Sequence, residues 1–180
     1  MNKHKAIIVN MSAGSGAGKS TNSARLFAML KDKGIEVELV TEFAKDLVWE
    51  GRNKAFECQA YIFGKQLYKI QRVADSVDVI ITDSPIFLSA IYDKEQDKNF
   101  KNYIITQFNK FNNLNIYLNR VKPFNPNGRN ESSEEEARIN DKKVFDFFSD
   151  NDIEYYNFNG NEEGCKEIFK LVIDRLNKIN

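Results

Sequence analysis

The chain has 180 residues, enough for one domain with a substantial core, and its composition of 42% hydrophobic and 29% charged residues is that of an ordinary globular protein. Lysine plus arginine and aspartate plus glutamate balance at 26 each, so no net charge favours nucleic acid or a membrane surface as a partner. The one histidine, His4, lies near the terminus, so we expect neither a His-based metal site nor a Ser-His-Asp triad, and the two cysteines have no metal-ligand spacing. Any catalysis must therefore use carboxylates, Lys, Arg and a bound metal.

The apolar runs are far shorter than the roughly 20 residues of a membrane span. The first residues lead into a short strand rather than into a secretory core. We therefore expect a cytoplasmic protein with no membrane partner.

A glycine-rich segment, 13–21 (AGSGAGKST), directly follows the apolar run 6–9 and directly precedes a helix-like segment. This is the context of a phosphate-binding loop, in which glycines let backbone N–H groups face phosphate oxygens at a helix N-terminus. Lys19 can reach the β- and γ-phosphates, and the Ser20 hydroxyl can ligate Mg²⁺. Ala13 replaces the first glycine of the pattern G-x-x-x-x-G-K-[S/T], which is tolerable if its φ is negative. We predict that ATP and Mg²⁺ bind through Gly14, Ser15, Gly16, Ala17, Gly18, Lys19, Ser20 and Thr21; GTP as the donor stays open.

The second predicted strand, 35–40, is followed by two carboxylates. Glu42 lies just beyond the strand end, at the same rim as Lys19, and can accept the proton of an attacking hydroxyl. Asp46 lies one helical turn further along and is the competing candidate.

The third predicted strand, 77–82, is a nearly continuous apolar run of the kind found in buried parallel sheets. Asp83 follows it, where open α/β sheets bind ligands, and could hold Mg²⁺ or a water bound to it. No glutamate follows Asp83 as a water-activating acid, which favours transfer to a bound acceptor over hydrolysis.

The polar, turn-rich stretch 120–133 separates the fourth strand, 115–119, from a helix over 134–149. A surface loop is one interpretation. A lid over about 120–137 is the other, because Arg120 and Arg129 could close over the phosphates and exclude water. Ser132 or Ser133 can cap the helix that follows.

Strand-like and helix-like segments alternate along the whole chain and predict a three-layer α/β fold, a five-stranded parallel sheet flanked by helices in a single domain, 1–180. The fifth strand is expected at 154–158. The remaining helices are expected at 19–33, 43–49, 56–73, 98–111 and 162–179, with a turn or helix from Pro85 to about residue 92.

The glycine loop, Glu42, Trp49 and the segment 56–61 (FECQAY) resemble the deoxynucleoside kinases, within the P-loop nucleoside and nucleotide kinases. The resemblance covers about the first half of the chain. It implies that Glu42 is the general base, that Trp49 lies at the acceptor site and that Gln59 hydrogen-bonds the nucleobase. Further pocket candidates are Phe56, Tyr61, Phe63 and Tyr92.

Two features depart from the deoxynucleoside kinases. Their acidic-Arg-Ser motif is replaced by Asp83-Ser84-Pro85, and the chain is short for the family. The Asp-Ser-Pro ending and the segment 42–45 (EFAK) resemble instead the ribosylnicotinamide kinase-type ATPases of bacteria and phages.

These patterns predict an ATP- and Mg²⁺-dependent kinase for a small nucleoside-like or nucleotide-like acceptor. One alternative is a phage-type kinase for polynucleotides or hydroxymethyl bases in DNA, with Lys94, Lys98, Lys101 and Lys110 as a basic face, which the neutral net charge does not favour. A nucleotide-dependent switch without phosphoryl transfer is the other. Assembly as a homodimer also stays open.

Overall fold

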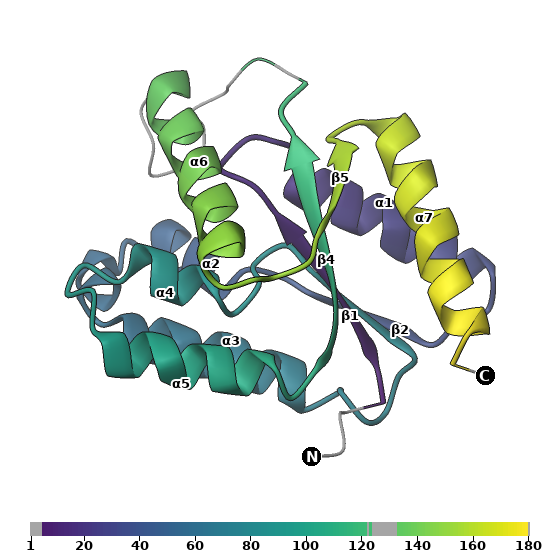
Figure 1. Cartoon of the computed structure of the whole chain (residues 1–180), viewed down its shortest axis with the longest axis horizontal. Coiled ribbons are helices and arrows are strands. Elements are labelled where there is room, and N and C mark those ends of the chain that lie inside the picture. The colour runs from purple at the N-terminus through teal and green to yellow at the C-terminus, as the bar shows by residue number, and fades with distance from the viewer. Residues whose placement is uncertain (1–4, 122, 124–132, 180) are drawn as a thin grey trace.

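A five-stranded parallel sheet forms the middle layer of the fold (Figure 1). The computed structural model describes residues 5–121, 123 and 133–179. The strands lie in the order β2-β3-β1-β4-β5, and every neighbouring pair is parallel. They are β1 (Ile7–Ser12), β2 (Val37–Val40), β3 (Val79–Thr82), β4 (Asn112–Asn119) and β5 (Tyr156–Asn159). All residues of the central strand β1 are buried, as expected for a strand covered on both faces.

Helices cover both faces of the sheet, which confirms the predicted three layers (Figure 1). Along the chain they are α1 (Lys19–Asp32), α2 (Phe43–Trp49), the 3-10 helix η1 (Asn53–Glu57), α3 (Gln59–Gln71), α4 (Leu88–Tyr92), α5 (Lys98–Phe108), α6 (Glu134–Asp150) and α7 (Glu162–Asn177). Helices α1 and α7 pack on one face and α3, α4, α5 and α6 on the other. No helix in the described part of the chain is both long and apolar enough to cross a membrane.

Alternate residues of β1 supply the two cores. Ile7 and Val9 belong to the cluster beneath α1 and α7, whereas Ile8 belongs to the cluster beneath α3 to α6. In the second cluster the fully buried ring of Phe87 contacts three other phenylalanine rings, with centroid separations of 5.2–5.7 Å. Both faces of the sheet are thus covered by apolar cores.

At the carboxyl ends of β1, β3 and β4 the chain leaves the sheet toward opposite faces. The helix that follows β1 covers one face, whereas the helices that follow its neighbours β3 and β4 cover the other. The chain segments therefore diverge beyond the end of β1, and open α/β sheets bind their ligands in such a crevice.

The predicted continuous helix over 56–73 is wrong at its start. The structure has η1 and then α3, separated by Cys58 in an extended conformation with φ −122° and ψ 87°. The apolar periodicity is similar on both sides of this residue, so the sequence pattern does not reveal a one-residue break.

Strand β4 begins three residues earlier than predicted because side-chain hydrogen bonds support its polar start. Asn10 of β1 donates to Oδ1 of Asn113 at 3.0 Å and of Asn115 at 2.9 Å. Asparagine is disfavoured in strands, and the cross-strand bonds offset that preference here.

Most of the predicted lid over 120–137, including Arg129, lies outside the described residues. Its end is described, and Ser133 caps α6 by accepting a hydrogen bond from the Glu136 N–H at 3.2 Å.

Replacing the central ring of the second core should destabilise the fold strongly. Phe87→Ala removes a fully buried ring, and we expect a loss of about 3–5 kcal/mol in the free energy of unfolding, measured by urea denaturation. Tyr68→Ala, at a side chain 66% exposed on α3, is the control and should change stability by roughly 0.5 kcal/mol or less. Equal losses in the two variants would contradict this packing.

Candidate active site

The loop between β1 and α1 has the backbone of a phosphate-binding loop. Gly16 and Gly18 have φ values of 79° and 102°, which only glycine adopts readily. Among the described residues other than glycine, positive φ occurs only at Gln96 and Asp152, so Ala13 has the negative φ that an alanine needs there. The loop therefore forms although its first glycine is replaced.

The N-terminus of α1 is electrostatically suited to an anion. The first turns of α6 and α7 contain glutamates, whereas the first turn of α1 contains no acidic residue. The helix dipole and the first backbone N–H groups are then not offset by a local carboxylate. The Lys19 ammonium adds charge above the loop, where it donates to the carbonyl oxygens of Ala13 at 2.9 Å and Gly14 at 3.0 Å.

Asp83 connects three strand ends. Its Oδ2 accepts a hydrogen bond from the Ser20 hydroxyl at 2.5 Å, and its Oδ1 accepts one from the Glu42 N–H at 3.1 Å. Only 5% of Asp83 is exposed, so these bonds compensate a buried carboxylate. The phosphate loop after β1, the Glu42 turn after β2 and the end of β3 are thereby held together.

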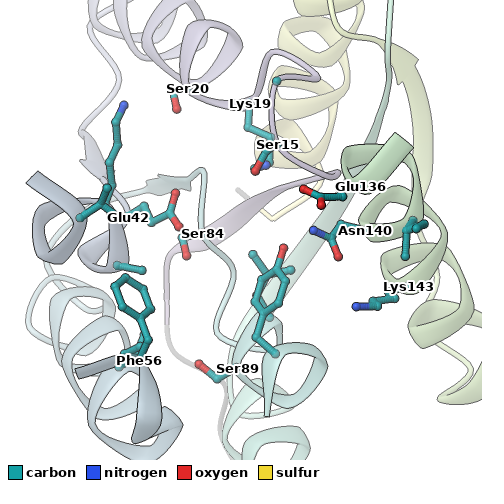
Figure 2. A pocket seen from close by; sticks show the side chains of 18 of the residues that line it. Ser15, Lys19, Ser20, Glu42, Phe56, Ser84, Ser89, Glu136, Asn140 and Lys143 are labelled. Carbon is teal, nitrogen blue, oxygen red and sulfur yellow. The ribbon is translucent and has the colours of Figure 1, made fainter. Parts of the chain in front are cut away.

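A pocket of about 930 Å³ opens from the phosphate loop. The predicted site residues on its surface are Ser15, Gly16, Gly18, Lys19, Ser20, Thr21, Glu42, Trp49, Phe56, Gln59 and Tyr92. Its surface also includes aromatic residues from α2, η1 and α4 and the aliphatic side chains of Val48, Ile62 and Leu88, and Figure 2 shows Phe56 at the end away from Lys19 and Ser20. The pocket thus combines polar backbone of the phosphate loop with apolar and aromatic side chains.

Helix α6 forms a wall that the sequence analysis did not predict. Figure 2 shows Glu42 and Ser84 on one wall of the pocket and Glu136, Asn140 and Lys143 on the opposite wall. These α6 residues are spaced by four and three positions, which places them on one helix face. This spacing is the signal that could have identified them, but charged stripes at such intervals are common on solvent-exposed helices.

Several predicted residues lie outside the pocket surface. Gly14, Ala17 and Asp83 are buried beside it. Asp46 is exposed on α2, away from the pocket. The ring of Tyr61 packs edge-to-face against the ring of Phe43, with centroids 5.5 Å apart. Phe63 is a buried core residue.

Arg120 faces Asp141 of α6 instead of the pocket. Its Nε and Nη2 donate to Asp141 Oδ2 at 3.1 and 3.0 Å, and its side chain is 4% exposed. The other carboxylate oxygen of Asp141 accepts the Gly14 N–H at 2.6 Å. This carboxylate therefore joins the phosphate loop, the end of β4 and α6, and we call it the Asp141 junction.

Close packing reinforces the Asp141 junction. A Cβ atom on Gly14 would lie 2.4 Å from the carbonyl oxygen of Ala137, so only glycine permits α6 to approach the loop this closely. The Tyr117 hydroxyl donates to the Asp141 carbonyl oxygen at 3.4 Å. Burial raises the pKa of Tyr117, and the negative charge of Asp141 raises it further, so the phenol remains protonated and able to donate.

The donor groups around the loop suit a cation that shares its ligands with a phosphate. In the described part of the chain, no three His, Cys, Asp or Glu side chains cluster where they could hold a metal ion unaided. Ser20 and Asp83 place two oxygen atoms side by side that could serve as ligands. Mg²⁺ commonly binds through one or two protein oxygens, with phosphates and water completing its shell.

The four lysines of the predicted basic face have different surroundings in the structure. Lys94 lies at the pocket. Lys101 lies over the ring of Phe147, 5.4 Å from its centroid, and Lys110 donates to the Gln107 side chain at 2.8 Å. Two of the four lysines thus have local partners.

The Asp141 junction should contribute strongly to stability. Asp141→Ala leaves the buried Arg120 guanidinium without its counter-ion, and we expect a loss of about 3 kcal/mol or more in the free energy of unfolding. Asp146→Ala breaks the exposed Lys142–Asp146 pair on the same helix and should cost roughly 0.5 kcal/mol or less. Chemical denaturation of both variants measures the difference, and similar losses would contradict a structural role for the junction.

No protein-family model and no curated protein sequence matches the chain. Many solved structures resemble it, and two of them are the following. The crystal structure of APE1195 has a TM-score of 0.53 and 20% identity, over 98% of this chain and 99% of that one. The crystal structure of NadR protein in complex with NR has a TM-score of 0.63 and 11% identity, over 94% of this chain and 50% of that one, so the chain spans about half the length of NadR. With the strand order and the glycine loop, these likenesses show that the chain has the three-layer fold of P-loop NTPases.

Proposed function

We propose that the protein is an ATP- and Mg²⁺-dependent phosphotransferase that acts on a small nucleoside-like or nucleotide-like acceptor. The observation that carries the proposal is the single pocket in which Figure 2 shows Lys19 and Ser20 of the phosphate-loop region at one end, Phe56 at the other and Glu42 between them. A donor phosphate and a ring-bearing acceptor could occupy the two ends together, which is the arrangement that phosphoryl transfer requires.

The loop would bind the donor phosphates. The N–H groups of Gly16 to Thr21 and the N-terminus of α1 offer hydrogen bonds and positive charge. Lys19 would exchange its bonds to the Ala13 and Gly14 carbonyl oxygens for phosphate oxygens. Ser20 and Asp83 would hold Mg²⁺, which supplies charge neutralisation for the phosphates when it is bound.

Glu42 would act on the acceptor. Its carboxylate would orient the acceptor hydroxyl and take up its proton as the hydroxyl oxygen bonds to the γ-phosphorus and the bond to the ADP oxygen breaks. The position of Glu42 on the pocket surface supports this role, whereas Asp46, the competing base, is not on that surface.

The aromatic end of the pocket would bind the acceptor base. Trp49, Phe56 and Tyr92 offer flat apolar surfaces for a ring, and the Gln59 amide can both donate to and accept from its edge. Because the sequence resembles ribosylnicotinamide kinase-type ATPases and NadR in complex with NR is a structural neighbour, nicotinamide riboside is one acceptor to test.

A cation from α6 would complete the site. Arg120 is engaged by Asp141, so the charge expected from it would come from elsewhere. Lys143 faces the pocket and makes no ion pair with the residues that the structure describes, which supports a role in neutralising charge on the transferred group.

An acceptor screen tests the proposed function. The protein is incubated with γ-³²P-ATP, Mg²⁺ and, separately, nucleosides, nucleoside monophosphates, nicotinamide riboside and hydroxymethyl-base DNA. We expect label on one class of small acceptor and its loss in Lys19→Ala, which removes the ammonium at the loop. Label on DNA would favour the nucleic-acid kinase, and label released only as free phosphate would favour the switch and contradict the proposal.

The role of Glu42 is tested by replacing its carboxylate with an amide. Glu42→Gln should lower turnover by ~10²-fold or more, the usual scale for a positioned base, and leave ATP affinity nearly intact. Steady-state kinetics and calorimetric titration with ATP measure the two quantities. Glu50→Gln, at the exposed end of α2, is the control. Unchanged turnover in Glu42→Gln with a loss in Asp46→Asn would assign the base to Asp46.

A further inference from the structure

The turn that carries Glu42 is held at three consecutive residues. The Thr41 carbonyl oxygen accepts a hydrogen bond from Lys69 Nζ at 2.7 Å, and the Glu42 N–H donates to Asp83. The Phe43 N–H donates to Oε1 of Gln66 at 3.0 Å. Helix α3, through Lys69 and Gln66, thus holds the backbone on both sides of Glu42.

Gln66 supplies a hydrogen-bond acceptor that the start of α2 otherwise lacks. Glu42 is the N-cap residue of α2, and its side chain makes no capping hydrogen bond. The N–H of the first helical residue, Phe43, has no acceptor within its own helix. Gln66 provides that acceptor from another helix, so the helix start is satisfied without the Glu42 carboxylate.

Gln66 is also an unusual residue at its position. It is 3% exposed and lies among the buried apolar residues of α3, such as Phe63 and Ile70. Its Nε2 donates to Oγ1 of Thr82 at 3.3 Å, and this oxygen also accepts the Ser84 N–H at 3.1 Å. A buried amide is costly unless fully bonded, and a residue of similar volume without polar atoms would pack there more cheaply.

Helix α3 also reaches the acceptor end of the pocket. Gln59 and Ile62 are on the pocket surface, and Gln59 precedes Gln66 by seven residues, about two helical turns. One rigid helix therefore bears both a candidate acceptor contact and the bond that fixes the Glu42 turn.

We propose that Gln66 is a positioning residue that sets the direction of the Glu42 carboxylate relative to the acceptor. This inference depends on the proposed role of Glu42 as the base. Gln66 itself is not on the pocket surface and acts through the Phe43 N–H and Thr82. Loss of its hydrogen bonds should therefore affect the transfer step more than ATP binding.

A double-mutant cycle tests the proposal. Gln66→Met keeps the side-chain volume and removes both polar atoms, and we expect turnover to fall roughly 10- to 100-fold with the KM for ATP almost unchanged. In the Glu42→Gln background the same substitution should have no further effect, because the group that it positions is already gone. Gln107→Met is the control and should leave turnover unchanged, since the Gln107 side chain is buried in α5 and its oxygen accepts a hydrogen bond from Lys110 Nζ.

Two further measurements complete the test. Hydrogen exchange at the Phe43 amide should become faster in Gln66→Met and not in Gln107→Met. If Gln66→Met does not fold, Lys69→Met releases the Thr41 carbonyl oxygen at a more accessible position and should show the same non-additivity with Glu42→Gln, with a smaller fall in turnover.

The outcomes separate this inference from the function on which it rests. An equal fall in turnover in both backgrounds, unchanged turnover in Gln66→Met or unchanged Phe43 exchange would overturn the positioning role while the kinase assignment stands. Absence of transfer to any acceptor by the unsubstituted protein would overturn the kinase assignment itself and, with it, the role of Gln66 in catalysis.

Discussion

The pair of hydrogen bonds to Asp83 is the constraint on which the arrangement of the candidate site depends. One oxygen is bonded to the Ser20 hydroxyl and the other to the Glu42 N–H, so a single buried carboxylate fixes the distance between the phosphate loop and the Glu42 turn. A carboxylate at the end of a buried strand is costly unless its oxygens are bonded. The same oxygens are the ones that a Mg²⁺ ion would use, which links the stability of the strand ends to the proposed chemistry.

The Asp141 junction has a comparable role on the opposite side of the loop. Asp141 joins the Gly14 N–H to the Arg120 guanidinium, and Gly14 allows α6 to contact the loop backbone. The face of α6 that carries Asn140 and Lys143 is thereby fixed against the pocket. The loop is thus supported from both sides, by Asp83 at the end of β3 and by Asp141 on α6, and its N–H groups are preorganised for an anion.

The parts of the fold that depend on local pattern could be predicted from the sequence. The strand, loop and helix around Lys19 and the carboxylate after β3 have strong local signals, and the alternation of elements indicates a parallel three-layer fold. The roles of Gln66 and Asp141 depend on contacts between residues far apart in the chain, such as Gly14 and Asp141, and a single sequence carries no record of such pairs. The sequence predicts Arg120 at the phosphates because arginines often bind phosphate. It does not reveal that Asp141, 21 residues further along the chain in α6, forms an ion pair with Arg120.

Donor phosphate and acceptor are expected to meet between the phosphate loop and Glu42. A crystal structure with Mg²⁺ and a non-hydrolysable ATP analogue would test this arrangement most directly. In that structure we expect the β- and γ-phosphates over Ser15 to Thr21 in contact with Lys19, the metal at Ser20 and Asp83, and the γ-phosphate turned toward the pocket that Glu42 lines. A triphosphate bound elsewhere, or a γ-phosphate directed away from Glu42, would contradict it.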